Sequence, residues 1–330
     1  MNTAARGRVV FTGRVIVDLT MEVDQRPPSG SEGFADAFSM TVGGGFHTLN
    51  TARRLGATAE YVGGTGTGPL GDVVRQALHH AGIITSGYWH ESLDTGFRVT
   101  IRESDKTKTR LNTKGAEVKP PLDAFDAVNP GTGDVVFLSG YTLYDEDSVA
   151  AVLRLVERMK QAGKVGGRPM PGYPIPLIDP TAMFADLPRE ALWAVQELYP
   201  IWTMNVREAR VGAERLQLDV DAGDTGRDLS AALSDRLESC MVIRAVGGTW
   251  VADGGEPRFI KAPEVEVTHP QRLSQVHMGA LAAELAMGST LDTATAWANA
   301  AAARAATIGG LSEAISRQNL APMVERTEFE

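Results

Sequence analysis

The chain has 330 residues, 43% hydrophobic and 22% charged, which is enough to bury one large α/β core with a small accessory element. Its formal net charge of -9 repels polyanions, so we expect no nucleic-acid partner, while a local cationic pocket for a small phosphate stays compatible with it. The single cysteine, Cys240, cannot form an internal disulfide. Arg14 and Asp18 interrupt the first apolar run, so we expect no signal or membrane-spanning segment, no membrane partner and a cytoplasmic location.

Short β-rich apolar runs alternate with helical patterns along most of the chain. The runs at 135–138, 176–178 and 241–243 are predicted strands, and 148–162 carries apolar residues at helical spacing. This alternation predicts βαβ units around a mainly parallel sheet. The stretch 163–176 is rich in glycine and proline, and we predict a loop there rather than a domain linker, because the next strand belongs to the same sheet.

Two other segments show strand-like alternation without a helix between neighbouring runs. They cover residues 13–23 and 95–112. We predict that they form a small antiparallel lid, inserted at about 13–42 and 95–115 into a single domain that spans 1–330. Because unpaired strand edges favour pairing with another chain, we also expect a homodimer formed through the lid.

A glycine pattern is the first chemical signal in the chain. Three consecutive glycines precede a predicted helix at 48–55, and they are Gly43, Gly44 and Gly45. Glycines in this position let a ligand approach the free N–H groups at a helix start, although a tight strand-to-helix turn explains an isolated triplet equally well. A second glycine-rich run at 63–72, before a predicted helix at 73–80, strengthens the ligand-binding interpretation.

Together these runs resemble the ribokinase-like (PfkB) family of carbohydrate kinases. Its first signature region is similar to the Gly-Gly-Gly-Phe turn at 43–46, the Arg-Leu-Gly helix end at 54–56, the Gly-x-Gly-x-x-Gly-Asp run ending at Asp72 and the Ala-Gly-Ile at 81–83. Further motifs follow in the family's order at 113–117, 133–136, 139–141, 178–180, 205–209 and 297–302. The resemblance runs from about Val9 to Gly310 and implies a three-layer α/β/α sandwich with a β-lid.

The family reaction is the ATP-dependent transfer of a phosphoryl group to a sugar hydroxyl. Such transfer needs positioning, charge neutralisation by Mg²⁺ and backbone donors, and a carboxylate that accepts the hydroxyl proton. In the family a Gly-Ala-Gly-Asp sequence at the start of a late helix supplies the donors and the base. The resemblance therefore implies ATP and Mg²⁺ as cofactors and a sugar, nucleoside or cyclitol as the ligand. The histidines and Cys240 show no metal-ligand spacing, so we expect no protein metal site.

The late helix departs from the family pattern at its start. When the register is taken from the alanine-rich stretch that ends at Gly288, Arg272, Leu273 and Ser274 stand in place of Gly-Ala-Gly, and Gln275 stands in place of the catalytic Asp. An amide does not accept a proton near neutral pH, and loss of a positioned base costs about 10²–10⁴ in rate. We therefore expect family-type kinase activity to be impaired or lost. Arg272 also crowds the phosphate position, or alternatively clamps the phosphate with its guanidinium.

The remaining candidate site residues follow from the resemblance. On the substrate side they are Asp18, the three glycines, Lys114 and His47, which stands where the family usually has an Asn. On the nucleotide side they are Asn205, Glu208, Arg244, Gly248, Ser274 and Asn299. Each also has a structural interpretation: Asp18 ends a strand in solvent, Asn205 and Glu208 form a helix-capping pair, and Asn299 caps or packs.

Three hypotheses follow for the chemistry. The first is a kinase with a rebuilt base, for which His269 and His277 are candidates, although we expect His277 to be packed inside its helix layer. The second is a repurposed enzyme that acts on a sugar-like or nucleoside-like ligand without ATP through His47, Asp18 or Arg272. The third is a catalytically silent sugar-binding homologue. Fold alone does not decide among them.

Overall fold

One nine-stranded sheet forms the centre of the computed structural model, which describes residues 7–162, 164–165, 168–169, 173–221, 223–308 and 315–327. From one edge to the other, its strands are β17 (Arg258–Lys261), β16 (Gly248–Ala252), β15 (Cys240–Ala245), β14 (Ile201–Asn205), β13 (Ile175–Asp179), β10 (Val135–Ser139), β1 (Arg8–Phe11), β4 (Thr58–Tyr61) and β6 (Ile84–Thr85). The strands from β15 to β6 pair in parallel, and β16 and β17 pair antiparallel. The mainly parallel sheet predicted from the sequence is confirmed.

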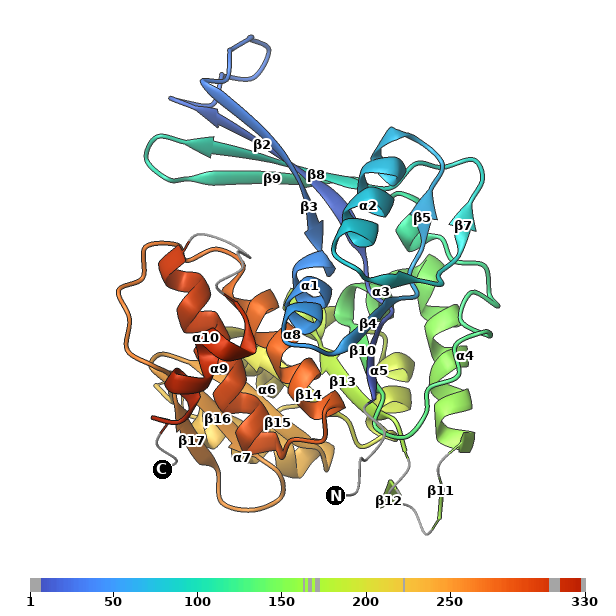
Figure 1. Ribbon diagram of the computed structural model, residues 1–330, viewed down its shortest axis with the longest axis vertical. Helices are drawn as coiled ribbons and strands as arrows, with labels where there is room; N and C mark the ends of the chain where they lie inside the picture. Colours follow the sequence, from blue (N-terminus) through green and yellow to red (C-terminus); the bar gives the residue numbers. More distant parts are fainter. Residues whose placement is uncertain are drawn as a thin grey trace.

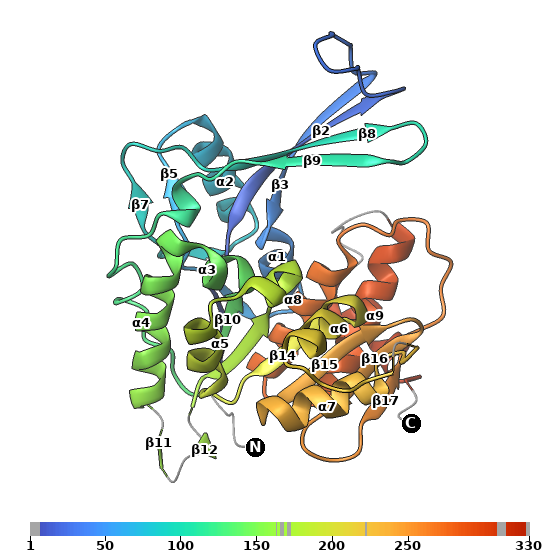
Figure 2. The same cartoon turned by 180° about the vertical axis from the view of Figure 1, so that it is seen from behind.

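Helices cover both faces of this sheet (Figures 1 and 2). Side chains alternate across a strand, so Val9 of β1 packs into one core and Val10 into the other. The first core contains α1 (Phe46–Arg54), α2 (Pro69–His80), α8 (Leu273–Ala286), α9 (Leu291–Ile308) and α10 (Arg317–Val324). The second contains α3 (Gly140–Tyr144), α4 (Glu146–Ala162), α5 (Arg189–Gln196), α6 (Val206–Arg215) and α7 (Arg227–Leu237). The result is the expected three-layer α/β/α sandwich.

A second, four-stranded sheet projects from the body of the protein (Figure 1). Its order is β3 (Ala37–Gly44), β2 (Val15–Val23), β8 (Phe97–Glu103) and β9 (Lys108–Asn112), and we call it the lid sheet. The outer pairs are antiparallel as expected, while the central strands β2 and β8 pair in parallel. The lid sheet therefore consists of two hairpins that extend in the same direction.

The helix starts differ from the predicted ones by a few residues. α1 begins at Phe46 rather than 48, and α2 begins at Pro69 rather than 73, because proline is well suited to the first helical position. The stretch 163–176 was expected to be a loop, and its described part contains the short strands β11 (Lys164–Val165) and β12 (Arg168–Pro169). Across the described residues, no helix has both the length and the apolar character needed to span a membrane.

α8 is the central helix of the first core. Every residue from Val276 to Ala286 is buried, as expected for a helix that is apolar all round. Gly279 permits close packing on α1, since a Cβ atom at this position would lie 2.3 Å from the carbonyl oxygen of Thr48. The start of α8 is consequently held beside the start of α1 and the base of the lid sheet.

The strand order places a binding site at one edge of the large sheet. From β1 the chain moves outward to β4 and β6, and then returns to the other side of β1 to form β10 and β13. In open α/β sheets, ligands bind outside the carboxyl ends of the strands where the order reverses in this way. β1, β10 and β13 end here at Phe11, Ser139 and Asp179.

Candidate active site

Two cavities lie at the carboxyl edge of the large sheet. The lid-side cavity, of about 330 Å³, is lined by the ends of β1, β10 and β13 and by residues of the lid sheet. The C-terminal cavity, of about 570 Å³, is lined by the turn between β15 and β16, the segment after β17 and the facing sides of α8 and α9. Both volumes fall in the range of small-molecule sites, roughly 300–1,000 Å³. The edge can therefore hold two small ligands.

The first turn of α8 separates the two cavities. Leu273 and Ser274 line the C-terminal cavity, and Gln275 lines the lid-side cavity. The first hydrogen bond within the helix runs from Val276 N–H to the carbonyl oxygen of Arg272, at 3.0 Å. The N–H groups of the first turn have no helical acceptor, and Arg272 provides no side-chain cap. They form a site for an anion between the cavities.

Arg272 starts this helix in a backbone conformation that normally favours glycine. Its φ of 66° lies in the left-handed region, which costs a residue with a Cβ atom roughly 1–2 kcal/mol. Its side chain leaves the helix start and donates from Nη2 to the hydroxyl oxygen of Thr41 on β3, at 3.3 Å. Arg272, which the resemblance aligns with a family glycine, is therefore compatible with this helix start, and its side chain reaches the lid sheet.

Asp179 places a carboxyl group in the same cavity as Gln275. It is the last residue of β13, and its Oδ1 accepts a hydrogen bond from Thr181 N–H at 3.1 Å. Burial raises the pKa of Asp179 to about 7, with a smaller upward effect from Glu208 and an opposing effect from Arg244. A carboxyl group with this pKa is suited to exchange protons near neutral pH. From the sequence, residues 178–180 indicate only a family motif, and the signal for Asp179 itself is an acidic residue directly after a buried strand.

Arg244 links the carboxyl groups at the floor of the two cavities. Its Nη1 donates to the Thr203 hydroxyl at 2.6 Å, and its Nη2 lies 3.6 Å from Oε2 of Glu208. Burial lowers the pKa of Arg244, while Asp179 and Glu208 favour its charged form. Arg244 lines the C-terminal cavity, where the sequence placed it on the nucleotide side.

Asn205 and Glu208 form a reciprocal capping box at the start of α6. The Asn205 Oδ1 accepts from Glu208 N–H, and the Glu208 Oε2 accepts from Asn205 N–H, both at 2.9 Å. The structural alternative for this pair thus holds. Asn205 also lines the C-terminal cavity, so the cap does not remove it from the site.

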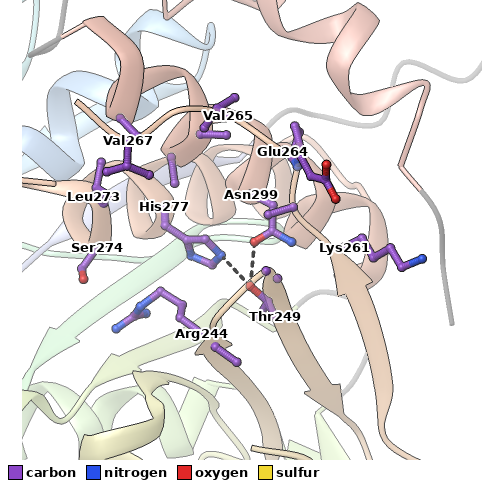
Figure 3. Close-up of a pocket in the computed structure, with 18 of the residues that line it drawn as sticks. Arg244, Thr249, Lys261, Glu264, Val265, Val267, Leu273, Ser274, His277 and Asn299 are labelled. Carbon is purple, nitrogen blue, oxygen red and sulfur yellow. Dashed lines mark hydrogen bonds between the residues drawn. The ribbon is translucent and has the colours of Figure 1, made fainter. Parts of the chain in front are cut away.

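A neutral hydrogen-bond network lines one wall of the C-terminal cavity (Figure 3). Thr249 Oγ1 donates to Asn299 Oδ1 at 2.6 Å, and Asn299 Nδ2 donates to the carbonyl oxygen of Ile260 at 2.8 Å. The Thr249 hydroxyl has only one hydrogen, so His277 Nε2, 3.3 Å away, is the donor of their mutual hydrogen bond. Burial, and secondarily the charge of Arg244, lower the pKa of His277 to about 3. His277 is therefore a neutral, packed residue, as expected.

His47 and Asp18 lie behind the lid-side cavity rather than in its lining. His47 is 6% exposed, and neither ring nitrogen has a hydrogen-bond partner among the described residues. Burial, followed by the charges of Arg272 and Arg98, lowers its pKa to about 3. Asp18 Oδ2 accepts from Arg98 Nη2 at 2.7 Å, and its carboxylate packs on Gly43, where a Cβ atom would lie 2.1 Å from Oδ2.

The other predicted site residues divide between the cavities and the surface. Gly44 and Gly45 line the lid-side cavity, and Gly248 lines the C-terminal cavity. Lys114 lines neither cavity: its side chain is 65% exposed and pairs with Asp145 Oδ2 at 2.8 Å. His269 is exposed on the surface. The site residues that the sequence did not identify are mainly Arg14, Arg98 and Arg110, all of which line the lid-side cavity.

The described part of the chain has no cluster of three or more His, Cys, Asp or Glu residues that could hold a metal ion. Mg²⁺ in nucleotide sites is typically bound by one or two carboxylates together with phosphate oxygens. Glu208 is the carboxylate beside the nucleotide-side Arg244, 3.6 Å from its Nη2, and it lines neither cavity. It would hold an ion that arrives with a nucleotide only together with phosphate oxygens.

Comparisons with known proteins agree with this geometry. The family model described as pfkB family carbohydrate kinase matches residues 6–317. A curated relative, the uncharacterized sugar kinase YegV of Escherichia coli (strain K12), is 24% identical over 299 residues, covering 90% of this chain and 88% of the relative. The structure of Arabidopsis thaliana ribokinase complexed with ribose and ATP has a TM-score of 0.76 at 17% identity, covering 98% of this chain and 99% of that one. Vibrio cholerae fructokinase, in its form with fructose, ADP and calcium ion, has a TM-score of 0.75 at 16% identity, covering 97% and 100%.

Proposed function

The chain belongs to the pfkB family of carbohydrate kinases, and on this premise we propose that it transfers a phosphoryl group from ATP in the C-terminal cavity to a hydroxyl group of a sugar-like molecule in the lid-side cavity. The observation that carries the proposal is the start of α8, whose free N–H groups lie between the two cavities. An anion bound there would contact both ligands. In the solved relatives, ribose and ATP, or fructose and ADP, are bound together by a protein of the same fold.

The C-terminal cavity fits a nucleotide in size and chemistry. Its lining combines the apolar Ala302, Ala303 and Ala306 of α9 with the polar network of Thr249, His277 and Asn299. An apolar slot with a few fixed polar groups suits a nucleobase and its ribose. The phosphate chain would then extend to the start of α8, where the N–H groups and the helix dipole favour negative charge.

Mg²⁺ bound with ATP would neutralise phosphate charge during transfer, and Glu208, beside Arg244, is the carboxylate that would hold it. The residues of the chain then position the reactants. The N–H groups of Leu273, Ser274 and Gln275 stabilise the charge on the transferred group. Arg244 adds a fixed positive charge on the nucleotide side.

The proton of the acceptor hydroxyl needs a base other than Gln275. We assign this role to Asp179, which lines the same cavity and has a pKa of about 7. The hydroxyl oxygen attacks the terminal phosphorus, its proton passes to the Asp179 carboxylate, and the bond between phosphorus and the bridging oxygen of ADP breaks. Gln275 then acts through hydrogen bonds that orient the hydroxyl. This arrangement is expected to be slower than the family pattern.

A mutant series tests the assignment. Product formation and ADP release are measured for the wild type, Asp179→Asn and Gln275→Asp across a panel of sugars, nucleosides and cyclitols. We expect Asp179→Asn to abolish turnover and Gln275→Asp to raise it. If the wild type binds Mg-ATP yet releases no ADP with any acceptor, and Gln275→Asp creates no activity, phosphoryl transfer is not the function.

One observation supports each of the two other hypotheses, the repurposed enzyme and the catalytically silent homologue. The ion pair between Asp18 and Arg98 occupies the carboxylate that the resemblance assigns to sugar hydroxyls, which favours a repurposed pocket. The absence of a carboxylate at Gln275 favours a silent binding homologue. Ligand binding in the lid-side cavity without measurable Mg-ATP binding would support the repurposed enzyme. Binding of both ligands without turnover would support the silent homologue.

We also propose a homodimer formed through the lid sheet. Its outer strands β3 and β9 each have one unpaired edge within the described chain, and the sheet exposes Phe38, Met40 and Leu111. Light scattering with size-exclusion chromatography tests this. A dimer that becomes a monomer in Phe38→Glu would support the lid interface, and a wild-type monomer would contradict it.

A further inference from the structure

Three arginine side chains line the lid-side cavity. Arg14 precedes β2, Arg98 lies on β8 and Arg110 lies on β9. The lining contains a single carboxyl group, Asp179. This small cavity is therefore strongly cationic, although the whole chain carries a net charge of -9. Such a local reversal of charge is typical of a site for an anion.

Two of the three guanidinium groups lack an ion pair among the described residues, and of these Arg14 is partly buried while Arg110 is exposed. Arg98 is paired with Asp18 at 2.7 Å. Within the described residues, the side chains of Arg14 and Arg110 make no hydrogen bond or ion pair, and Arg14 instead lies 4.3 Å from the ring centroid of Tyr141. Burial lowers the pKa of Arg14, which shows that its charge has lost much of its hydration.

The carboxylates that face Arg14 from neighbouring elements are already engaged. Glu117 accepts hydrogen bonds from the N–H groups of Gly96 and Gly115, at 2.8 and 3.2 Å. Asp145 is paired with Lys114. Both act on Arg14 through space, but neither forms an ion pair with it. A partly buried cation in this position is stabilised by an anion that enters the cavity.

The two lid arginines converge on one face of the sheet. Arg110 pairs with Thr100 across the strands, and Asn112 pairs with Arg98. Because residues two apart on a strand share a face, Arg98 and Arg110 are diagonal neighbours there. Gln275 and Asp179 belong to the body of the protein, on α8 and β13. The cavity thus has a cationic lid side and a body side that holds the groups assigned to proton transfer.

On the basis of the proposed function, we propose that the acceptor is an anionic sugar, with a carboxylate or phosphate group held by Arg14, Arg98 and Arg110 and a hydroxyl group presented to Gln275 and Asp179. Guanidinium groups match the oxygens of carboxylate and phosphate in geometry and charge. A neutral sugar would leave the partly buried charge of Arg14 without an ion pair, whereas the charge of Arg110 would stay exposed to solvent.

A nucleoside acceptor fits the cavity less well than an anionic sugar. Its aromatic lining consists of Phe11, Phe137 and Tyr141. Phe11 and Phe137 pack on each other with ring centroids 5.0 Å apart, and Arg14 covers Tyr141. With a volume of about 330 Å³, the cavity suits a monosaccharide that carries one charged group better than a base and a ribose.

Isothermal titration without nucleotide tests the proposal on the full chain. The probes are matched sets: glucose with gluconate and glucose 6-phosphate, fructose with fructose 6-phosphate, ribose with ribonate and ribose 5-phosphate, and inorganic phosphate alone. We expect at least one anionic probe to bind about tenfold to one-hundredfold more tightly than its neutral counterpart, because hydrogen bonds to charged groups are strong. Preference for the acid or for the phosphate identifies the charged group. Binding of the anionic probe should weaken as ionic strength rises.

Three variants locate the binding site. Arg14→Gln and Arg110→Gln should each lower the affinity for the anionic probe about tenfold or more without changing the affinity for Mg-ATP. Arg102→Gln is the matched control, because Arg102 lies on β8 but pairs with Glu22 and does not line the cavity. If no anionic probe binds more tightly than its neutral counterpart, or if the control weakens binding as much as the cavity variants, the proposal is wrong.

ADP release with Mg-ATP, measured across the same probes and the acceptor panel, separates this proposal from the kinase assignment. Arginine-dependent binding of an anionic probe, with no ADP release for any acceptor, refutes the kinase assignment and leaves the anion site intact. A neutral sugar that is phosphorylated while its anionic counterparts are not bound refutes the anion site and leaves the kinase assignment intact.

Discussion

The two cavities differ in how their polar groups are satisfied. In the C-terminal cavity, Thr249, Asn299 and His277 bond to one another, and His277 is neutral. In the lid-side cavity, Arg14 and Arg110 stay charged without an ion pair among the described residues. Because Thr249, Asn299 and His277 Nε2 satisfy one another, this wall can receive a nucleobase and its ribose at little electrostatic cost. Arg14, partly buried and without an ion pair among the described residues, instead favours a ligand of opposite charge.

The start of α8 shows a different contrast, between backbone and side chains. Its backbone still presents free N–H groups between the cavities, even though Arg272 must adopt a left-handed conformation. We expect its side chains to differ from the family pattern, most importantly at Gln275. Anion binding by the backbone tolerates such substitutions, whereas acid–base chemistry requires a specific side chain. The predictions below separate these two contributions.

Restoration of the family pattern should have the largest effect. We expect the triple variant Arg272→Gly, Ser274→Gly, Gln275→Asp to raise the rate of phosphoryl transfer by about 10²–10⁴, because a carboxylate replaces an amide beside the acceptor. The rate of ADP release at saturating substrate concentrations measures the rate of phosphoryl transfer. The double variant without Gln275→Asp is the control. Equal rates in the double and triple variants would show that the side chain at 275 does not limit the reaction.

Removal of Asp179 should have the next largest effect. We expect Asp179→Asn to lower kcat by about 10² or more while Mg-ATP affinity stays within a few-fold. Because the carboxylate form is the base and the pKa is about 7, the wild-type rate should rise between pH 6 and 8. The variant should lose this rise. A variant with the wild-type pH profile would show that another group accepts the proton.

The two buried histidines should make the fold sensitive to acid. Their folded pKa values of about 3 lie below the ordinary 6.5, so the unfolded chain binds more protons in this window. Each histidine should therefore lower the free energy of unfolding by up to about 1.4 kcal/mol per pH unit as the pH falls from 6.5 towards 3. Urea unfolding of His47→Asn between pH 7 and 4.5 should show a smaller slope. The exposed His80→Asn is the control, and an unchanged slope in His47→Asn would contradict the prediction.

The smallest expected effect is relief of strain at the start of α8. Arg272→Gly removes a side chain from a residue with φ of 66°, and we expect a gain of about 1 kcal/mol in the free energy of unfolding. Loss of the hydrogen bond to Thr41 opposes part of this gain. Thermal unfolding measures the net change in the free energy of unfolding from these two effects. Clear destabilisation would mean that the contact of Arg272 with the lid sheet outweighs the backbone strain.

The sequence predicted the fold well because the relevant signals are local. Apolar runs with strand or helix periodicity located β10, β13, β15 and α4, and the closing Gly288 allowed Gln275 to be placed near the start of α8. The predicted helix starts were less accurate, since residues such as Pro69 extend a helix beyond its periodic apolar part. Gln275 as the position of the lost base stays a prediction.

The lid-side cavity was harder to predict because it is assembled from distant segments. Arg14, Arg98 and Arg110 each resemble solvated charges in the sequence, and only the pairing of β2, β8 and β9 brings them to one cavity. The pKa of Asp179 depends on its burial and on the charges of Arg244, on β15, and Glu208, in the first turn of α6. Lys114 illustrates the opposite case, since a motif residue assigned to the substrate instead pairs with Asp145.

One measurement tests the central claim that nucleotide and acceptor meet at the start of α8. Isothermal titration of Mg-ATP is compared between the wild type and Ala302→Trp, which fills the C-terminal cavity from α9. We predict one nucleotide per chain for the wild type, loss of nucleotide binding in the variant and unchanged affinity of the variant for the anionic sugar. Absence of Mg-ATP binding by the wild type, or nucleotide binding that survives the tryptophan, would contradict the account.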